Sequence, residues 1–120
     1  AEIFAAGNEA FVNRDPMGAF AFAGDLAVQV RDDLDVKEFI RDQSGLIILF
    51  SLTYWKDNAN LSDPRATERS REMMTKQRYD ALHYSLDLTI TQAKRNRNPS
   101  LVSGAKAAKS LIDTLQTQSL

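Results

Sequence analysis

Two Asp-Pro pairs constrain the fold of this chain more than any other feature of its sequence. They are Asp15-Pro16 and Asp63-Pro64. In each pair the Asp side chain can cap a helix, and the Pro, which has no N–H, fits the first helical turn at no cost in hydrogen bonding. A third proline ends the basic stretch KRNRNP at 94–99, where Asn and Pro stop a helix and basic residues favour its C-terminus. The pairs therefore predict two helix starts, and the basic stretch predicts a helix end.

Between these signals, apolar residues recur at intervals of three and four, which is typical of helices that bury one face. Short connections between long helices favour antiparallel neighbours. We therefore expect an all-α fold, an up-down four-helix bundle over residues 16–120, preceded by a lead-in segment at 1–15. The predicted helices span 16–31, 36–55, 64–94 and the residues that follow Ser100, which is expected to cap the last helix.

The core is expected to centre on large apolar side chains of the last three helices. The most apolar run, 46–50, is far shorter than the roughly 20 residues that span a membrane, so it is interpreted as core. The expected core residues are Leu46, Leu49, Phe50, Leu82, Leu86, Ile112 and Leu115.

One segment also fits a β-strand. Apolar and polar residues alternate strictly over 82–90, which is a strand pattern when taken alone. An α+β fold with a strand at 82–90 is therefore the alternative. Helix is favoured because no Gly, Pro or Asn interrupts 65–93.

Charge is distributed unevenly along the chain. Residues 1–64 carry a net charge of −6 and residues 65–120 carry +5, although the chain as a whole carries −1. This near-neutral total and the acidic first half argue against a nucleic-acid partner. The uneven charge is typical of an ordinary dipolar surface, and it also fits a surface that docks on an acidic partner. The candidate partner-binding residues are Lys94, Arg95 and Arg97 at the end of the third helix and Lys106 and Lys109 on one face of the fourth.

Residues that would support catalysis are scarce. The chain has no cysteine, which excludes disulfides, thiolate metal sites and cysteine nucleophiles. It has no nucleophile elbow, no glycine-rich phosphate loop and no Glu-x-x-His metal motif, so we expect no enzyme activity, no metal and no cofactor. His83 is the one histidine, and Asp80 could orient it. One alternative function is a small-molecule or haem-binding bundle, with His83 and Met17, Met73 or Met74 as haem ligands. Another is a basic-faced interaction module, an adaptor that would bind nucleic acid through residues 65–97.

Four segments of the sequence resemble one family, the PsbQ-like small extrinsic proteins of photosystem II. The resemblance covers roughly residues 36–118, and the proline-rich arm of plant members is missing, which indicates an algal or diatom type. The segments are FIRDQSGLIILFSLTYWKD (39–57), TKQRYDALHYSLD (75–87), QAKRNRNPS (92–100) and AKAAKSLIDTLQ (105–116).

The resemblance implies a four-helix bundle in the thylakoid lumen of a plastid. Such a protein is a non-enzymatic subunit that docks on the lumenal face of photosystem II, peripheral to the membrane and not inserted in it. It supports oxygen evolution by helping to retain calcium and chloride at the manganese cluster. A small residue at position 1 suits the mature end left by a signal peptidase, so a processed chain is expected.

Overall fold

The computed structural model describes residues 15–33 and 38–117, except for the side chains of 38–42. This part is helical throughout and contains no strand, so the all-α prediction is confirmed and the alternative of a strand at 82–90 is wrong. The lead-in segment lies almost wholly outside the described residues. The helices are α2 (Pro16–Asp32), α3 (Glu38–Asn58), α4 (Pro64–Met73), α5 (Lys76–Arg95) and α6 (Pro99–Thr117).

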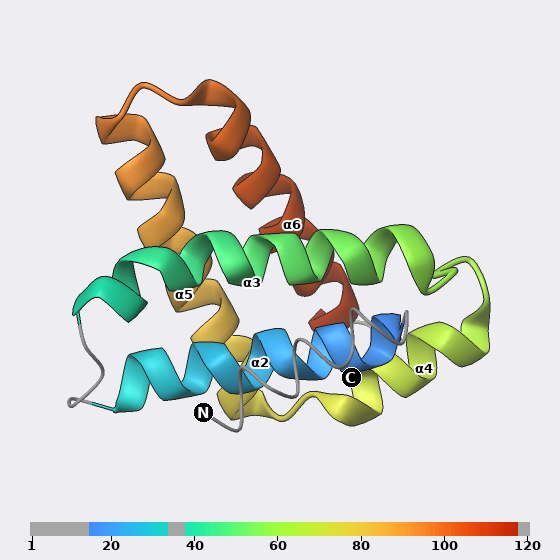
Figure 1. Cartoon of the computed structure of the whole chain (residues 1–120). Coiled ribbons are helices and arrows are strands. Elements are labelled where there is room, and N and C mark those ends of the chain that lie inside the picture. Colours follow the sequence, from blue (N-terminus) through green and yellow to red (C-terminus); the bar gives the residue numbers. More distant parts are fainter. Residues whose placement is uncertain (1–14, 34–37, 118–120) are drawn as a thin grey trace.

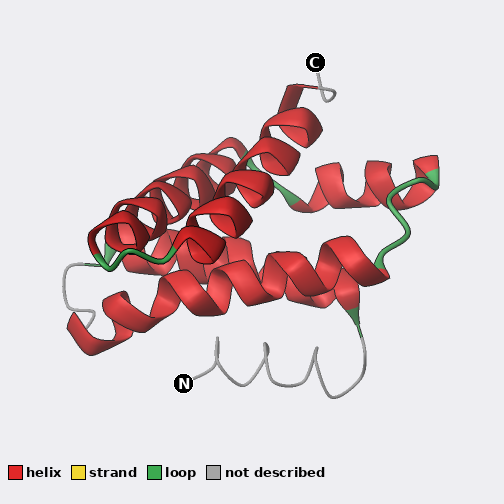
Figure 2. Ribbon diagram, turned by 90° about the horizontal axis from the view of Figure 1, so that it is seen from above, coloured by secondary structure: helices red, strands yellow, loops and turns green. Residues whose placement is uncertain are grey.

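The helices form two antiparallel pairs that cross each other (Figure 1). One pair is α2 with α3, the other is α5 with α6, and the short α4 connects them. The view from above in Figure 2 shows the same crossing. The end at which α5 turns into α6 projects beyond α3, and we call residues 94–103 the hairpin tip. Because the pairs cross, an up-down four-helix bundle is not confirmed.

All three prolines stand directly after a capping Asx residue. Asp15 accepts a hydrogen bond from the Gly18 N–H at 3.0 Å, and Asp63 accepts one from the Arg65 N–H at 2.9 Å. Both predicted helix starts are confirmed. The last helix begins at Pro99 after Asn98, whose Oδ1 accepts from the Leu101 N–H at 3.2 Å. The prediction of Ser100 as its cap was wrong, because Asn-Pro repeats the arrangement of the two Asp-Pro pairs.

The predicted third helix is broken at Met74. This residue has an extended backbone, with φ −103° and ψ 123°, and its side chain is buried against α2. It fits there because position 24 is Gly, where a Cβ would lie 2.9 Å from Met74 Cε. Thr75 then caps α5 by accepting from the Arg78 N–H at 3.2 Å. The prediction of one helix over 64–94 was wrong because packing against α2 favours a bend.

An ion pair holds this bend in place. The Arg78 guanidinium donates to the Met73 carbonyl at the end of α4 and lies 2.7 Å from the Asp25 carboxylate of α2. The bend turns α5 away from the direction of α4, and α5 then crosses the α2–α3 pair.

A buried aromatic pair joins the first three helices of the described part. The rings of Phe20 and Trp55 stack with centroids 3.9 Å apart. The Trp55 Nε1–H donates to Ser70 Oγ at 3.0 Å, and that hydroxyl donates to the Ala66 carbonyl at 2.9 Å. The one polar atom of the Trp55 side chain is therefore satisfied inside the core, as a buried indole requires.

Helix α2 makes most of the contacts between the two pairs, through α5, and α3 also crosses both α5 and α6. A Cβ at Gly45 would overlap Thr89 Oγ1, so this glycine lets α3 approach α5. A Cβ at Gly104 would lie 3.7 Å from Leu49 Cδ2, which is an ordinary contact distance, so α6 packs against α3 without requiring a glycine there. The close approach of α3 to α5 therefore depends on Gly45.

This crossing explains which core predictions failed. Leu46 is 49% exposed and Phe50 is 62% exposed, so their assignment to the core was wrong. Leu46 follows Gly45 and Phe50 follows Leu49 by one position, so each side chain points about 100° away around the helix from the residue that meets α5 or α6. Leu49 is partly buried. The remaining core predictions are confirmed for Leu82, Leu86, Ile112 and Leu115.

Candidate interaction site

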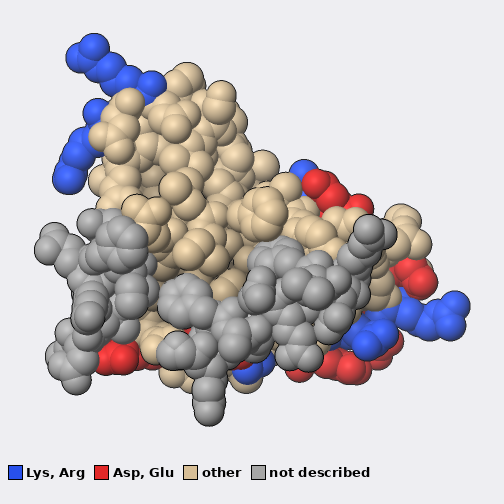
Figure 3. All heavy atoms as spheres, viewed as in Figure 1, with Lys and Arg blue, Asp and Glu red and all other residues tan. Residues whose placement is uncertain are grey.

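The five predicted partner-binding residues all lie on the α5–α6 hairpin. Residues 88–112 contain these five basic residues and no Asp or Glu. Figure 3 shows Lys and Arg side chains gathered where the hairpin tip projects from the molecule. Four of the five are exposed, and none of the four makes an ion pair with any described residue: Lys94, Arg95, Arg97 and Lys106.

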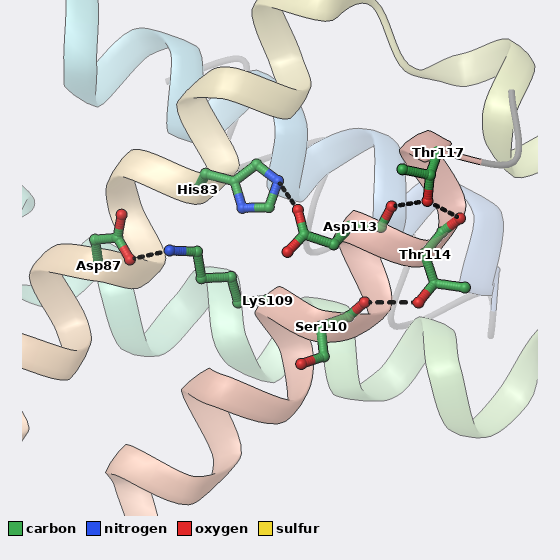
Figure 4. Close-up of polar contacts among 7 residues, drawn as sticks. All are labelled: His83, Asp87, Lys109, Ser110, Asp113, Thr114 and Thr117. Atoms are coloured by element: carbon green, nitrogen blue, oxygen red, sulfur yellow. Dashed lines mark hydrogen bonds and ion pairs between the residues drawn. The ribbon is translucent and has the colours of Figure 1, made fainter. Parts of the chain in front are cut away.

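Lys109 is bound differently from the other four. Its Nζ lies 2.6 Å from Asp87 Oδ1, across the interface between α6 and α5 (Figure 4). Only 35% of the Lys109 side chain is exposed. Its charge is therefore balanced within the molecule, and it contributes less to a cationic surface than the sequence suggests.

A second polar pair lies one helical turn away. His83 Nε2 is 3.2 Å from Asp113 Oδ1, again between α5 and α6 (Figure 4). We call His83, Asp87, Lys109 and Asp113 the polar seam. Asp80 is not the partner of the histidine, so that expectation was wrong. The spacing of four residues on each helix lets both pairs form at once.

The polar seam offers no obvious place for a cofactor or metal. No group of three or more His, Asp or Glu side chains that could hold a metal occurs among the described residues. His83 Nδ1 is buried and has no hydrogen-bond partner in the described part of the chain. Because His83 Nε2 is directed at Asp113, the haem-binding alternative gains no support.

A hollow of about 380 Å³ lies in the hairpin tip, between the end of α5 and the start of α6. Its apolar base includes Ala93, which is buried, and Val102, which is half-buried. Exposed Lys94 and Arg97 stand at its edge. We call it the tip hollow, and its lining residues are Ala93, Lys94, Arg97, Asn98, Pro99, Val102 and Ser103.

Arg97 has an unusual backbone for its residue type. Its φ is 53°, in the left-handed region. The Asn98 N–H donates to the Ala93 carbonyl at 2.9 Å, and the Arg97 N–H donates to the Lys94 carbonyl at 3.2 Å. These two bonds form a Schellman motif, in which glycine is usual at the position of Arg97. An arginine there costs about 1 kcal/mol that glycine would not.

A second, larger hollow lies between α2 and the start of α5. It has about 460 Å³ and is lined by Asp25, Val28, Gln29, Thr75, Gln77 and Arg78. Its one cation, Arg78, is already paired with Asp25. The tip hollow is the better candidate because its two cations have no acidic partner among the described residues.

The chain matches no protein-family model, no curated protein sequence and no solved structure. No described helix is long and apolar enough to cross a membrane.

Proposed function

We propose that this protein is a non-enzymatic subunit that docks on an acidic surface of a larger partner through its hairpin tip. The observation that supports the proposal is the charge of residues 88–112, five basic residues with no acidic one. Four of these side chains are solvated and lack an acidic partner in the described structure, so they are available to a partner. Lys109 supports the surface indirectly, by fixing α6 against α5.

The rest of the chain has the opposite charge. The total is −1, so the residues outside 88–112 carry −6. A molecule polarised in this way is oriented by an acidic partner before contact, which raises the rate of productive encounters. Each exposed ion pair adds little affinity alone. Salt screens such pairs, so binding through the tip must be salt-sensitive.

The partner proposed is the lumenal face of photosystem II, on the strength of the resemblance to PsbQ-like proteins. The subunit would sit in the thylakoid lumen, peripheral to the membrane, and would help to retain calcium and chloride at the manganese cluster. The four-helix up-down bundle of that family belongs to the same proposal, with α4 and α5 counted as one interrupted third helix.

The test is rebinding to photosynthetic membranes from which extrinsic proteins have been washed with salt. A triple reversal, Lys94→Glu, Arg95→Glu and Arg97→Glu, should weaken rebinding and flatten its dependence on salt. The Tm should change little, because these side chains are exposed. A matched control reverses three exposed basic residues outside the hairpin tip, Lys56, Arg69 and Lys76.

Two outcomes would count against the proposal in different ways. If both triple variants rebind equally well, the hairpin tip is not the docking surface. If the unaltered protein does not rebind and oxygen evolution is not restored, photosystem II is not the partner.

A further inference from the structure

From the geometry of the hairpin tip we infer that the tip hollow receives an apolar side chain from an acidic segment of the partner protein. This inference rests on the proposed docking function and specifies the chemistry of the segment that is recognised. An apolar residue of the segment enters the hollow, and carboxylates on either side of it pair with Lys94 and Arg97.

The lining of the tip hollow matches such a segment. Ala93, Pro99 and Val102 supply apolar surface, and Lys94 and Arg97 supply two positive charges beside it. The volume of about 380 Å³ falls within the range of about 300–1,000 Å³ that is typical of ligand sites. A cationic surface without a hollow would bind any anion, whereas this one can select a segment that is both acidic and apolar.

The tip hollow is held in shape before any partner binds. The hydrogen bond from the Asn98 N–H to the Ala93 carbonyl joins two of its lining residues across the turn. Asn98 also caps α6 through the Leu101 N–H. A preformed site binds more tightly because less motion is lost on binding.

The backbone of Arg97 is a second sign of function. A left-handed arginine where glycine is usual is the kind of local strain that clusters at binding sites. Arg97 lines the tip hollow, so its charge at that position accounts for the departure from glycine.

A protein segment fits these features better than a nucleic acid or a lipid surface. A phosphodiester chain carries charge but presents no small apolar side chain between its phosphates. A lipid surface would contact a broad area and would not select one apolar side chain.

Two labelled peptides test the inference on the full-length chain. One has a single leucine with two acidic residues on each side, and the other has serine in place of the leucine. Fluorescence anisotropy at low salt should show the leucine peptide binding about tenfold more tightly, because one apolar side chain is buried. The Lys94, Arg95 and Arg97 triple reversal should abolish binding of both peptides.

Two substitutions in the tip hollow separate its role from that of charge. Val102→Asn makes the base polar, and Ser103→Leu fills part of the space. Both should remove the preference for leucine and leave the binding of the serine peptide unchanged. Lys106→Ala is the matched control, because Lys106 does not line the tip hollow. This substitution should lower the affinity for both peptides by the same factor. Thermal melts show that each variant is folded.

Equal affinity for the two peptides, or no binding of either, would overturn the inference. So would a leucine preference that survives both hollow variants. Tighter binding to phosphatidylglycerol vesicles or to single-stranded DNA, unaffected by Val102→Asn, would mean that the site takes a lipid or a nucleic acid. Loss of membrane rebinding in the triple reversal, without any leucine preference, would leave the proposed function standing and reject this inference alone.

Discussion

At the scale of single residues, some side chains of this protein lower the stability of its fold, and others raise it. Arg97 has a left-handed backbone in a position that suits glycine. Tyr79 has a buried hydroxyl without a hydrogen-bond partner in the described residues. Trp55, by contrast, has its polar atom fully satisfied by Ser70. These three cases predict changes in stability of different sign.

Arg97→Gly should raise the free energy of unfolding by about 1 kcal/mol, because glycine adopts the left-handed backbone without strain. The same change should weaken docking, since it removes one of the charges at the tip. Urea unfolding measures the first effect and membrane rebinding the second. Arg97→Lys keeps both the strain and the charge and should leave stability unchanged. A loss of stability in the glycine variant would contradict the Schellman assignment.

Ser70→Ala should lower the free energy of unfolding by about 1–3 kcal/mol, because it leaves the Trp55 Nε1–H buried without an acceptor. Chemical denaturation followed by tryptophan fluorescence measures the change. Ser62→Ala is the control, since Ser62 is exposed and bonds only to Asn60 Oδ1. Equal effects of the two changes would show that the hydrogen bond in the core contributes nothing.

Tyr79 should make the fold sensitive to alkali. Burial raises the pKa of the Tyr79 hydroxyl, although Arg71 opposes this with its positive charge. The unfolded chain therefore loses this proton at a lower pH than the folded one, and stability falls as the pH rises through about 10. Tyr79→Phe should reduce that fall and cost little at pH 7, where the hydroxyl has no partner to lose. Unfolding midpoints of both proteins between pH 8 and about 11 test this.

At the scale of helices, the two Asp-Pro starts could be predicted from sequence, whereas the bend at Met74 and the helix start after Thr75 could not. Asp15-Pro16 and Asp63-Pro64 are local signals, and both were interpreted correctly. The break at Met74 depends on the space that Gly24 leaves on another helix. No Gly, Pro or Asn marks it in the sequence. Thr75 was the one available sign, and threonine is too common inside helices to indicate a cap without knowledge of the fold.

In the core and in the candidate site, too, some features could be predicted from the sequence and others depend on how the helices pack. The periodicity of α3 shows that it is apolar around most of its girth, but which side is covered depends on the crossing. Leu46 and Phe50 were misassigned for this reason. The basic residues of the hairpin were found from sequence alone. The pairing of Lys109 with Asp87 was not, because it depends on how α6 is aligned with α5.

The contact between α3 and α5 predicts a mutational rescue. Gly45→Ala should destabilise the fold by about 1–3 kcal/mol, because the added Cβ would overlap Thr89 Oγ1. In a Thr89→Ala background the same change should cost much less, since the nearest remaining atom, Thr89 Cβ, would lie 3.5 Å away. A double-mutant cycle measured by denaturant unfolding gives the coupling energy. A coupling near zero would mean that the helices do not meet here.

At the scale of the whole molecule, the distance over which its charges act on a partner depends on the salt concentration. The longest dimension is 37 Å, and the screening length of salt falls from about 30 Å at 0.01 M to about 10 Å at 0.1 M. Charges that lie across the molecule from the hairpin tip can therefore act on an acidic partner only at low salt.

The rate of association with the partner should consequently fall steeply over this range of salt, while the rate of dissociation changes less. Surface plasmon resonance on immobilised partner measures both rates. In the triple reversal of Lys94, Arg95 and Arg97, the association rate should depend less on salt. In the reversal of Lys56, Arg69 and Lys76, its dependence on salt should be unchanged. Identical salt profiles for the two variants would place the steering charges elsewhere.

The crossing of two helical pairs also bears on how the chain folds. Within each pair the two helices are neighbours in sequence, whereas contacts between the pairs join distant residues such as Gly45 and Thr89. Close contacts form quickly and distant ones slowly. The α2–α3 and α5–α6 pairs should therefore behave as two cooperative units that form early and dock late, each visible as a separate set of amide protons in native-state hydrogen exchange.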